Sequence, residues 1–131
     1  MKNLILSICL SICALFGAVK VSAQTIPASM LPEIVAEMQK LCPQEVEKGM
    51  VMNKVYLQNS NSEIVFDFTF NEKIYGVSSS ELIKEFKEMT PAQKKQYLGE
   101  EFAQIATMLP VPVYANFIFA DGKTFKMKLT D

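Results

Sequence analysis

The apolar positions of the chain change their spacing several times between residue 29 and the C-terminus. From Ser29 to Cys42 they recur every three or four residues, which is the spacing of one face of a helix. Pro43 cannot continue that helix, so the segment 29–42 is predicted to be helical and to end there. The apolar residues on this stripe are Leu31, Ile34, Val35, Met38 and Leu41.

A β-hairpin is predicted next. Met50 to Leu57 is rich in apolar and β-branched residues, and Asn59-Ser60-Asn61 supplies the polar, turn-forming residues that connect two strands. Glu63 to Phe70 then alternates strictly between apolar and other residues. Such alternation is typical of a strand with one buried face. The residues of that face are Ile64, Phe66, Phe68 and Phe70.

Two helix starts follow. Ser78 with Glu81, and Thr90 with Gln93, have the spacing of a capping box, and Pro91 occupies the first helical position of the second segment. The first helix has an apolar stripe of Leu82, Ile83 and Phe86. The second has a stripe of Leu98, Phe102, Ile105 and Leu109 and is predicted to end at Pro110.

The remaining chain predicts a second, tighter hairpin. Its apolar positions alternate on both sides of Asp121-Gly122, a strong turn dipeptide, while Lys126 and Lys128 face away from them. These apolar positions are Val113, Ala115, Phe117, Phe119, Phe125, Met127 and Leu129. The predicted order is therefore α-β-β-α-α-β-β. Because each hairpin has one apolar and one mostly polar face, we expect an α+β fold with a four-stranded antiparallel sheet and helices packed on one face.

The first 23 residues are predicted to be a secretory signal peptide. Lys2 gives a positive start, the run from Leu4 to Val19 is apolar, and Val21-Ser22-Ala23 provides the small residues at a cleavage site. We expect cleavage between Ala23 and Gln24, leaving a single domain of residues 24–131, located in the periplasm or secreted. Lys20 interrupts the apolar run too early for a retained anchor, so no membrane span is expected after cleavage.

Lipid attachment is the alternative for this segment. Cys9 and Cys13 lie in the apolar run, but Ile8 and Ile12 precede them where lipoprotein sites carry a small residue. Lipidation is therefore disfavoured.

Charge narrows the range of partners. Without Lys2 and Lys20, the processed chain has eleven lysines against 14 acidic residues, a formal charge of −3. Arginine is absent, so bidentate recognition of phosphate has no donor, and nucleic acid is not an expected partner. Cys42 is the one cysteine left, and we interpret it as a small buried hydrophobe, with pairing to another chain as the alternative.

Catalytic chemistry has few candidates. The chain contains no histidine, which removes Ser-His-Asp and Cys-His arrangements and imidazole metal sites. Glu63 with Asp67, or Glu100 with Glu101, could form a glycosidase-type carboxylate pair, but their positions predict solvated surface residues. Ser78-Ser79-Ser80 is better explained as a helix start, and the dispersed methionines as core residues. We expect no enzyme activity, no cofactor and no metal.

The polar side of the predicted sheet is the candidate interaction surface, because an uncovered sheet face with tyrosines can bind a protein. Its candidate residues are Asp67, Thr69, Tyr114, Asn116 and Ile118. The hypothesis is a non-enzymatic binding module, such as an inhibitor, immunity or adaptor protein that binds a protein partner outside the cytoplasm. The alternative is a carrier of a small apolar or cell-envelope ligand, lined by some of the eight phenylalanines that remain after processing.

Four segments resemble a broad group of small secreted α+β proteins of Gram-negative bacteria, mostly of unknown function. They are Leu41-Cys42-Pro43, the run from Val46 to Gly49, the strand from Ile64 to Phe70, and Asp121-Gly122-Lys123-Thr124. The resemblance covers nearly all of the processed chain. It implies export to the periplasm or beyond, and it supplies no catalytic residues.

Overall fold

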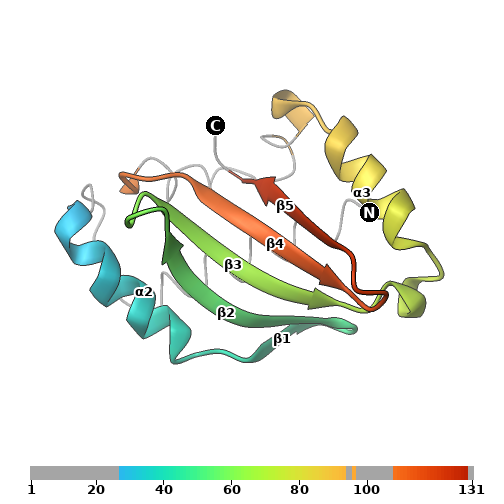
Figure 1. The fold of residues 1–131 in the computed structure, drawn as a ribbon, viewed down its shortest axis with the longest axis horizontal. Coiled ribbons are helices and arrows are strands. Elements are labelled where there is room, and N and C mark those ends of the chain that lie inside the picture. The colour runs from blue at the N-terminus through green and yellow to red at the C-terminus, as the bar shows by residue number, and fades with distance from the viewer. Residues whose placement is uncertain (1–26, 94–95, 97–107, 130–131) are drawn as a thin grey trace.

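One sheet of five strands forms the centre of the fold, and the order of the strands in space follows their order in the sequence (Figure 1). The computed structural model describes residues 27–93, 96 and 108–129. The strands are β1 (Gln44–Glu47), β2 (Met50–Gln58), β3 (Glu63–Phe70), β4 (Val113–Phe119) and β5 (Thr124–Lys128). All neighbouring strands are antiparallel except β3 and β4, which are parallel.

Two described α-helices, α2 (Leu31–Gln39) and α3 (Ser79–Glu88), pack on one face of this sheet. Two short 3-10 helices, η1 (Ala28–Met30) and η2 (Glu72–Tyr75), precede them in the chain. In Figure 1, α2 lies along β2, and α3 lies near β5 at the opposite edge. Leu31 and Met38 of α2, and Leu82 and Phe86 of α3, join the same core cluster as the inward side of the strands. The predicted arrangement with helices on one face therefore holds for the described helices.

The predicted helix starts are formed as their sequences indicate. Ser78 accepts a hydrogen bond on its Oγ from the Glu81 N–H at 3.1 Å. Thr90 and Gln93 bond reciprocally, with side chain to backbone distances of 2.8 and 3.1 Å, and residues 91–93 are helical. Leu98, Phe102 and Ile105 of this predicted helix lie outside the described residues, whereas Leu109 is described and joins the core cluster.

The predicted antiparallel sheet is corrected to a mixed one. Between β3 and β4 the chain passes through η2 and α3 and returns so that Ile64 pairs with Val113 and Phe70 with Phe119, both strands running the same way. A long helical connection permits a parallel pair, which a tight turn cannot make. Each hairpin is internally antiparallel as predicted, but the alternation within a hairpin does not fix how two hairpins join.

The predicted number of strands is also wrong, because β1 was missed. Its sequence, Gln-Glu-Val-Glu, has little apolar alternation, and it pairs with β2 through a turn at Lys48 and Gly49. Gly49 has φ +85°, and an added Cβ would lie 3.0 Å from Cδ1 of Ile74. Glycine fits this turn because it adopts a left-handed conformation at little cost.

Phenylalanines fill the core between the sheet and the helices. Phe66, Phe68 and Phe117 are fully buried, and Phe86 of α3 stacks on Phe117 with ring centroids 5.1 Å apart. In β4, buried and half-buried residues alternate along the whole strand, as predicted for its two faces.

A register shift explains the weaker alternation of β2. Between Met52 and Lys54 the pairing with β3 slips by one residue, so Asn53 is the extra residue of a β-bulge. The buried positions therefore change from Met50 and Met52 to Val55.

Candidate functional site

The side of the sheet opposite the core carries the predicted interaction residues, and we call it the polar face. Its side chains come from β2 to β5, and they are Lys54, Tyr56, Gln58, Glu63, Val65, Asp67, Thr69, Tyr114, Asn116, Ile118 and Lys126. Asp67 is paired with Asn116, and Thr69 with Ile118, across the parallel β3 and β4 pair. Tyr114 is one step further along β4, opposite Val65. All five predicted residues are therefore close neighbours on one surface.

Asp67 is the centre of the hydrogen bonding on this face. Its Oδ1 accepts a hydrogen bond from the Tyr56 hydroxyl at 3.2 Å and another from the Asn116 amide at 3.1 Å. These three residues come from three adjacent strands, β2, β3 and β4. The carboxylate thus holds two neighbouring side chains in fixed orientations, which makes the middle of the polar face a defined surface.

Lys126 spans the same face from the edge strand β5. Its Nζ lies 4.5 Å from the ring centroid of Tyr114, donates a hydrogen bond to Gln58 Oε1 at 2.8 Å, and lies 3.5 Å from Glu63 Oε1. The ammonium therefore contacts an aromatic ring, an amide and a carboxylate on three other strands. This arrangement covers part of Tyr114 and connects β5 to β2.

Tyr56 titrates above its ordinary range. Partial burial raises the pKa of its phenol most, and the negative charge and hydrogen bond of Asp67 raise it further. The neutral phenol, which is the form that donates to Asp67, therefore persists throughout the neutral pH range. Its hydroxyl is a constant donor under physiological conditions.

The carboxylates considered for glycosidase chemistry are not placed as a catalytic pair. Glu63 and Asp67 share the polar face of β3 but are separated by four residues, about 13 Å along a strand. Glycosidases hold their two carboxyl groups about 5 to 9.5 Å apart. Glu63 instead contacts Asn59 and Lys126. Glu100 and Glu101 lie outside the described residues.

The serine run and Cys42 have structural roles. Ser78 caps α3, and Ser79 is buried and donates to Asp121. Cys42 is half-buried against the core cluster, its Sγ lies 3.9 Å from the Met38 carbonyl oxygen, and burial raises the pKa of its thiol. A thiol with a raised pKa is a poor nucleophile at neutral pH.

Comparison with known proteins gives a fold. No family model and no curated protein sequence matches the chain. A solved structure shares the architecture. It is the pilotin EpsS from the type 2 secretion system of Vibrio vulnificus, with a TM-score of 0.50 and 10% sequence identity, covering 79% of this chain and 86% of the pilotin. The match agrees with an α+β fold and with the coarse resemblance to small Gram-negative proteins; at this identity it carries no residue roles.

Across the ranges that the structure describes, no helix combines the length and the apolar character needed to cross a bilayer. Those same ranges hold no group of three or more acidic, cysteine or histidine side chains that could bind a metal ion.

Sequence reasoning missed three residues that organise the polar face or its surroundings. Tyr56 offered one signal, an amphipathic aromatic side chain of the kind enriched at interfaces, and Lys126 gave none beyond its place opposite the apolar positions of a strand. Glu72 is only 4% exposed, and its Oε2 accepts a hydrogen bond from the Ala120 N–H at 2.9 Å. Its one sequence signal is an acidic residue two positions after a predicted buried strand.

Proposed function

We propose that this chain is an exported, non-enzymatic module that binds a protein partner through the polar face. The observation that carries the proposal is the grouping of Asp67, Thr69, Tyr114, Asn116 and Ile118 on two adjacent central strands. Their contiguity across the β3 and β4 pair supports the proposal that they form one docking surface.

The chemistry of the polar face supports a protein as the partner. Asp67 uses Oδ1 for Tyr56 and Asn116, and within the described part of the chain no donor lies on its Oδ2. That oxygen is available to a lysine, an arginine or a backbone N–H of a partner. Ile118, half-buried between the polar neighbours Thr69 and Thr124, offers an apolar contact beside it.

The fold supports an adaptor in the cell envelope over an inhibitor or immunity protein. The matched protein is a pilotin of a type 2 secretion system, and its fold is shared over most of both chains. The predicted signal peptide of residues 1–23, cleaved between Ala23 and Gln24, would bring the processed domain out of the cytoplasm. An adaptor for an envelope assembly accounts for both the fold match and the predicted export.

The carrier of a small apolar ligand is less well supported. It needs phenylalanines that line a cavity, whereas Phe68, Phe86 and Phe119 all lie within 6.4 Å of Phe117, centroid to centroid, and pack on one another. Aromatic rings that contact each other are filling the core.

Affinity capture from the envelope tests the proposed function. The tagged, exported protein is crosslinked in intact cells and recovered in parallel with Ile118→Asp and with Glu33→Lys, a control on the exposed side of α2. We expect a stoichiometric protein partner with the unchanged protein and with the control, and at least a severalfold lower yield with Ile118→Asp. Equal yields from all three, or no stoichiometric protein in any, would contradict the proposal.

A further inference from the structure

The outer edge of β5 exposes backbone groups of two alternate residues. The Leu129 N–H donates to the Val113 carbonyl at 2.8 Å, and the Phe119 N–H donates to the Lys123 carbonyl at 2.9 Å. In an antiparallel pair, the residues between such bonded positions direct their N–H and C=O groups away from the partner strand. Thr124 and Lys126 therefore point these groups outward, both residues are exposed, and no described strand pairs with that edge.

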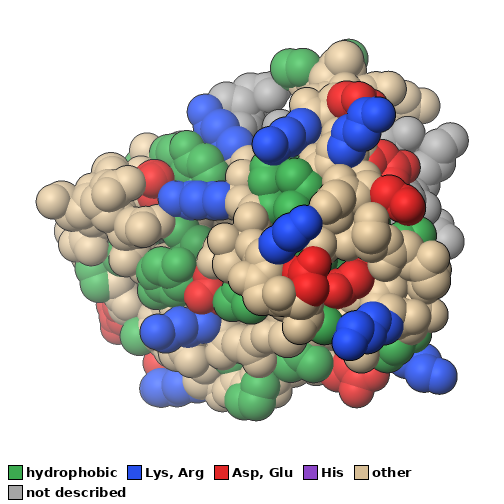
Figure 2. Space-filling view, turned by 45° about the vertical axis from the view of Figure 1, so that its right-hand side comes forward, with side chains coloured by type: hydrophobic (Ala, Val, Ile, Leu, Met, Phe, Trp, Pro, Cys, Tyr) green, Lys and Arg blue, Asp and Glu red, His purple; other side chains and the backbone are tan. Residues whose placement is uncertain are grey.

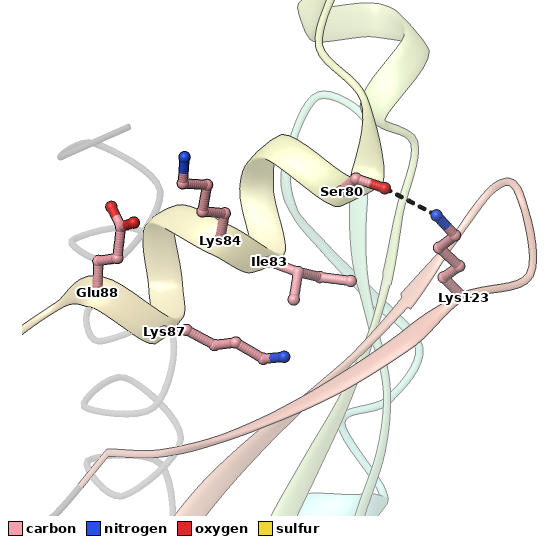
Figure 3. A pocket seen from close by; sticks show the side chains of 6 residues that line it. All are labelled: Ser80, Ile83, Lys84, Lys87, Glu88 and Lys123. Carbon is pink, nitrogen blue, oxygen red and sulfur yellow. Dashed lines mark hydrogen bonds between the residues drawn. The ribbon is translucent and has the colours of Figure 1, made fainter.

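A groove lies beside the start of this strand, between α3 and the turn that precedes β5 (Figure 3). It measures about 410 Å³ and is lined by Ser80, Ile83, Lys84, Lys87, Glu88 and Lys123. Ile83 and Lys87 extend from α3 toward the second hairpin, and Lys123 reaches Ser80 at 2.7 Å (Figure 3). With three lysines and one glutamate, the lining has an excess of positive charge although the whole chain is acidic.

The wider surface is mixed in charge. Figure 2, in which the side carrying α3 is turned toward the viewer, shows lysine side chains, with acidic side chains among them, around a hydrophobic patch. Ile83 is half-buried and is the apolar member of the groove lining. The groove therefore combines positive charge with a small apolar contact, next to unpaired backbone donors and acceptors.

We propose that this groove and the β5 edge together bind an extended acidic segment of a partner protein, which adds to the sheet as a sixth strand. The unpaired groups of Thr124 and Lys126 would supply the main-chain hydrogen bonds of strand addition. Lys87 and Lys123 would select acidic side chains by charge. The inference rests on the proposed protein-binding function and adds a second contact to the polar face.

The geometry also specifies a pattern in the bound segment. An added strand lies about 4.8 Å beyond β5, and its alternate side chains point to the core side, where α3 is. Phe86 of α3 stacks on Phe125 of β5 with ring centroids 6.0 Å apart, so α3 covers this side of the edge. Residues of the segment that face α3 should therefore be acidic near the lysines and apolar opposite Ile83, and those between them face solvent.

A capped synthetic peptide, acetyl-Thr-Glu-Thr-Val-Thr-Glu-Thr-amide, is the probe. It is titrated to millimolar concentration into the isotopically labelled, exported protein, and backbone amide shifts and hydrogen exchange are followed by NMR. We expect slower exchange of the Thr124 and Lys126 amides. The double variant Lys87→Glu with Lys123→Glu should bind about tenfold more weakly, and added salt should weaken binding further.

The matched control reverses two exposed lysines at the other edge of the sheet, Lys40→Glu with Lys48→Glu, and should bind like the unchanged protein. No binding, or binding that leaves the exchange of Thr124 and Lys126 unchanged, would overturn the inference. So would concentration-dependent protection of these amides without peptide, because a second copy would then occupy the edge. A partner captured through Ile118 but insensitive to the Lys87 and Lys123 changes would remove this inference alone and leave the proposed function intact.

Discussion

Ser79 donates a hydrogen bond from its buried hydroxyl to Asp121, a residue 42 positions later in the turn between β4 and β5. Asp121 also accepts from the Lys123 N–H at 3.0 Å. The Ser79 hydroxyl lowers the pKa of the Asp121 carboxyl most, and the Lys123 N–H lowers it further. A lowered pKa means that Asp121 contributes stability above the unfolded value of about 3.9, and that this contribution is lost as the pH falls through the folded value.

Replacing Ser79 by alanine should destabilise the protein by about 1 to 2 kcal/mol, because a part-buried hydrogen bond between α3 and the second hairpin is lost. Urea unfolding at neutral pH measures the change. The control is Ser80→Ala, whose exposed hydroxyl accepts from Lys123 and should cost less than half as much. Equal losses for the two variants would show that Ser79 does not join the elements.

Glu72 should be the most sensitive acidic residue in the described chain. Its buried carboxylate accepts the Ala120 N–H, so Glu72→Ala leaves that donor without its partner and should cost about 1 to 3 kcal/mol. Glu72→Gln keeps an acceptor oxygen for the Ala120 N–H, so it should lose less than half as much stability as Glu72→Ala. Thermal unfolding of the two variants measures this difference, and identical melting temperatures would rule out the hydrogen bond as the cause.

The Tyr56 phenol should ionise above about pH 10, and Asp67→Asn should lower its pKa toward that value without removing the whole shift, because burial is the larger cause. Alkaline difference absorbance measures this, with Tyr56→Phe identifying the contribution of this tyrosine. The neutral Tyr56 phenol therefore stabilises the fold below about pH 10, and this contribution to stability is lost as the pH rises through the folded pKa of Tyr56. A pKa unchanged by Asp67→Asn would contradict the contact.

Cys42 should react slowly with a disulfide reagent at pH 8 in the folded protein and rapidly after denaturation. Burial keeps its pKa above the ordinary value, and only the thiolate attacks. The rates of thiol labelling with and without urea measure the difference. Equal rates, or a disulfide-linked dimer on a non-reducing gel, would favour the alternative in which Cys42 pairs with another chain.

The elements that the sequence predicts correctly are those with a strong local pattern. The alternation from Val113 to Phe119 predicts both faces of β4, and Asp121-Gly122 predicts its turn, because side chains alternate and glycine tolerates the φ of +89° at Gly122. Capping at Ser78 and Thr90 was equally local. These features depend on residues a few positions apart.

Features set by distant contacts were not predictable. The parallel pairing of β3 with β4 depends on how the connection packs, and β1 forms only because β2 offers an edge to a polar segment. The polar face was predicted as a group, yet the role of Lys126 was not, since it depends on Gln58 and Glu63 from two other strands.

The most direct test of the central claim is site-specific photocrosslinking on the polar face. A photoreactive residue at position 118 replaces Ile118 in one strain, and the same residue replaces Glu33 on the exposed side of α2 in another. In intact cells that export the protein, the photoreactive residue at position 118 should give one dominant crosslinked protein, and the same residue at position 33 should not give it. Adducts of equal yield from both positions, or none from position 118, would contradict the assignment of the polar face as the docking surface.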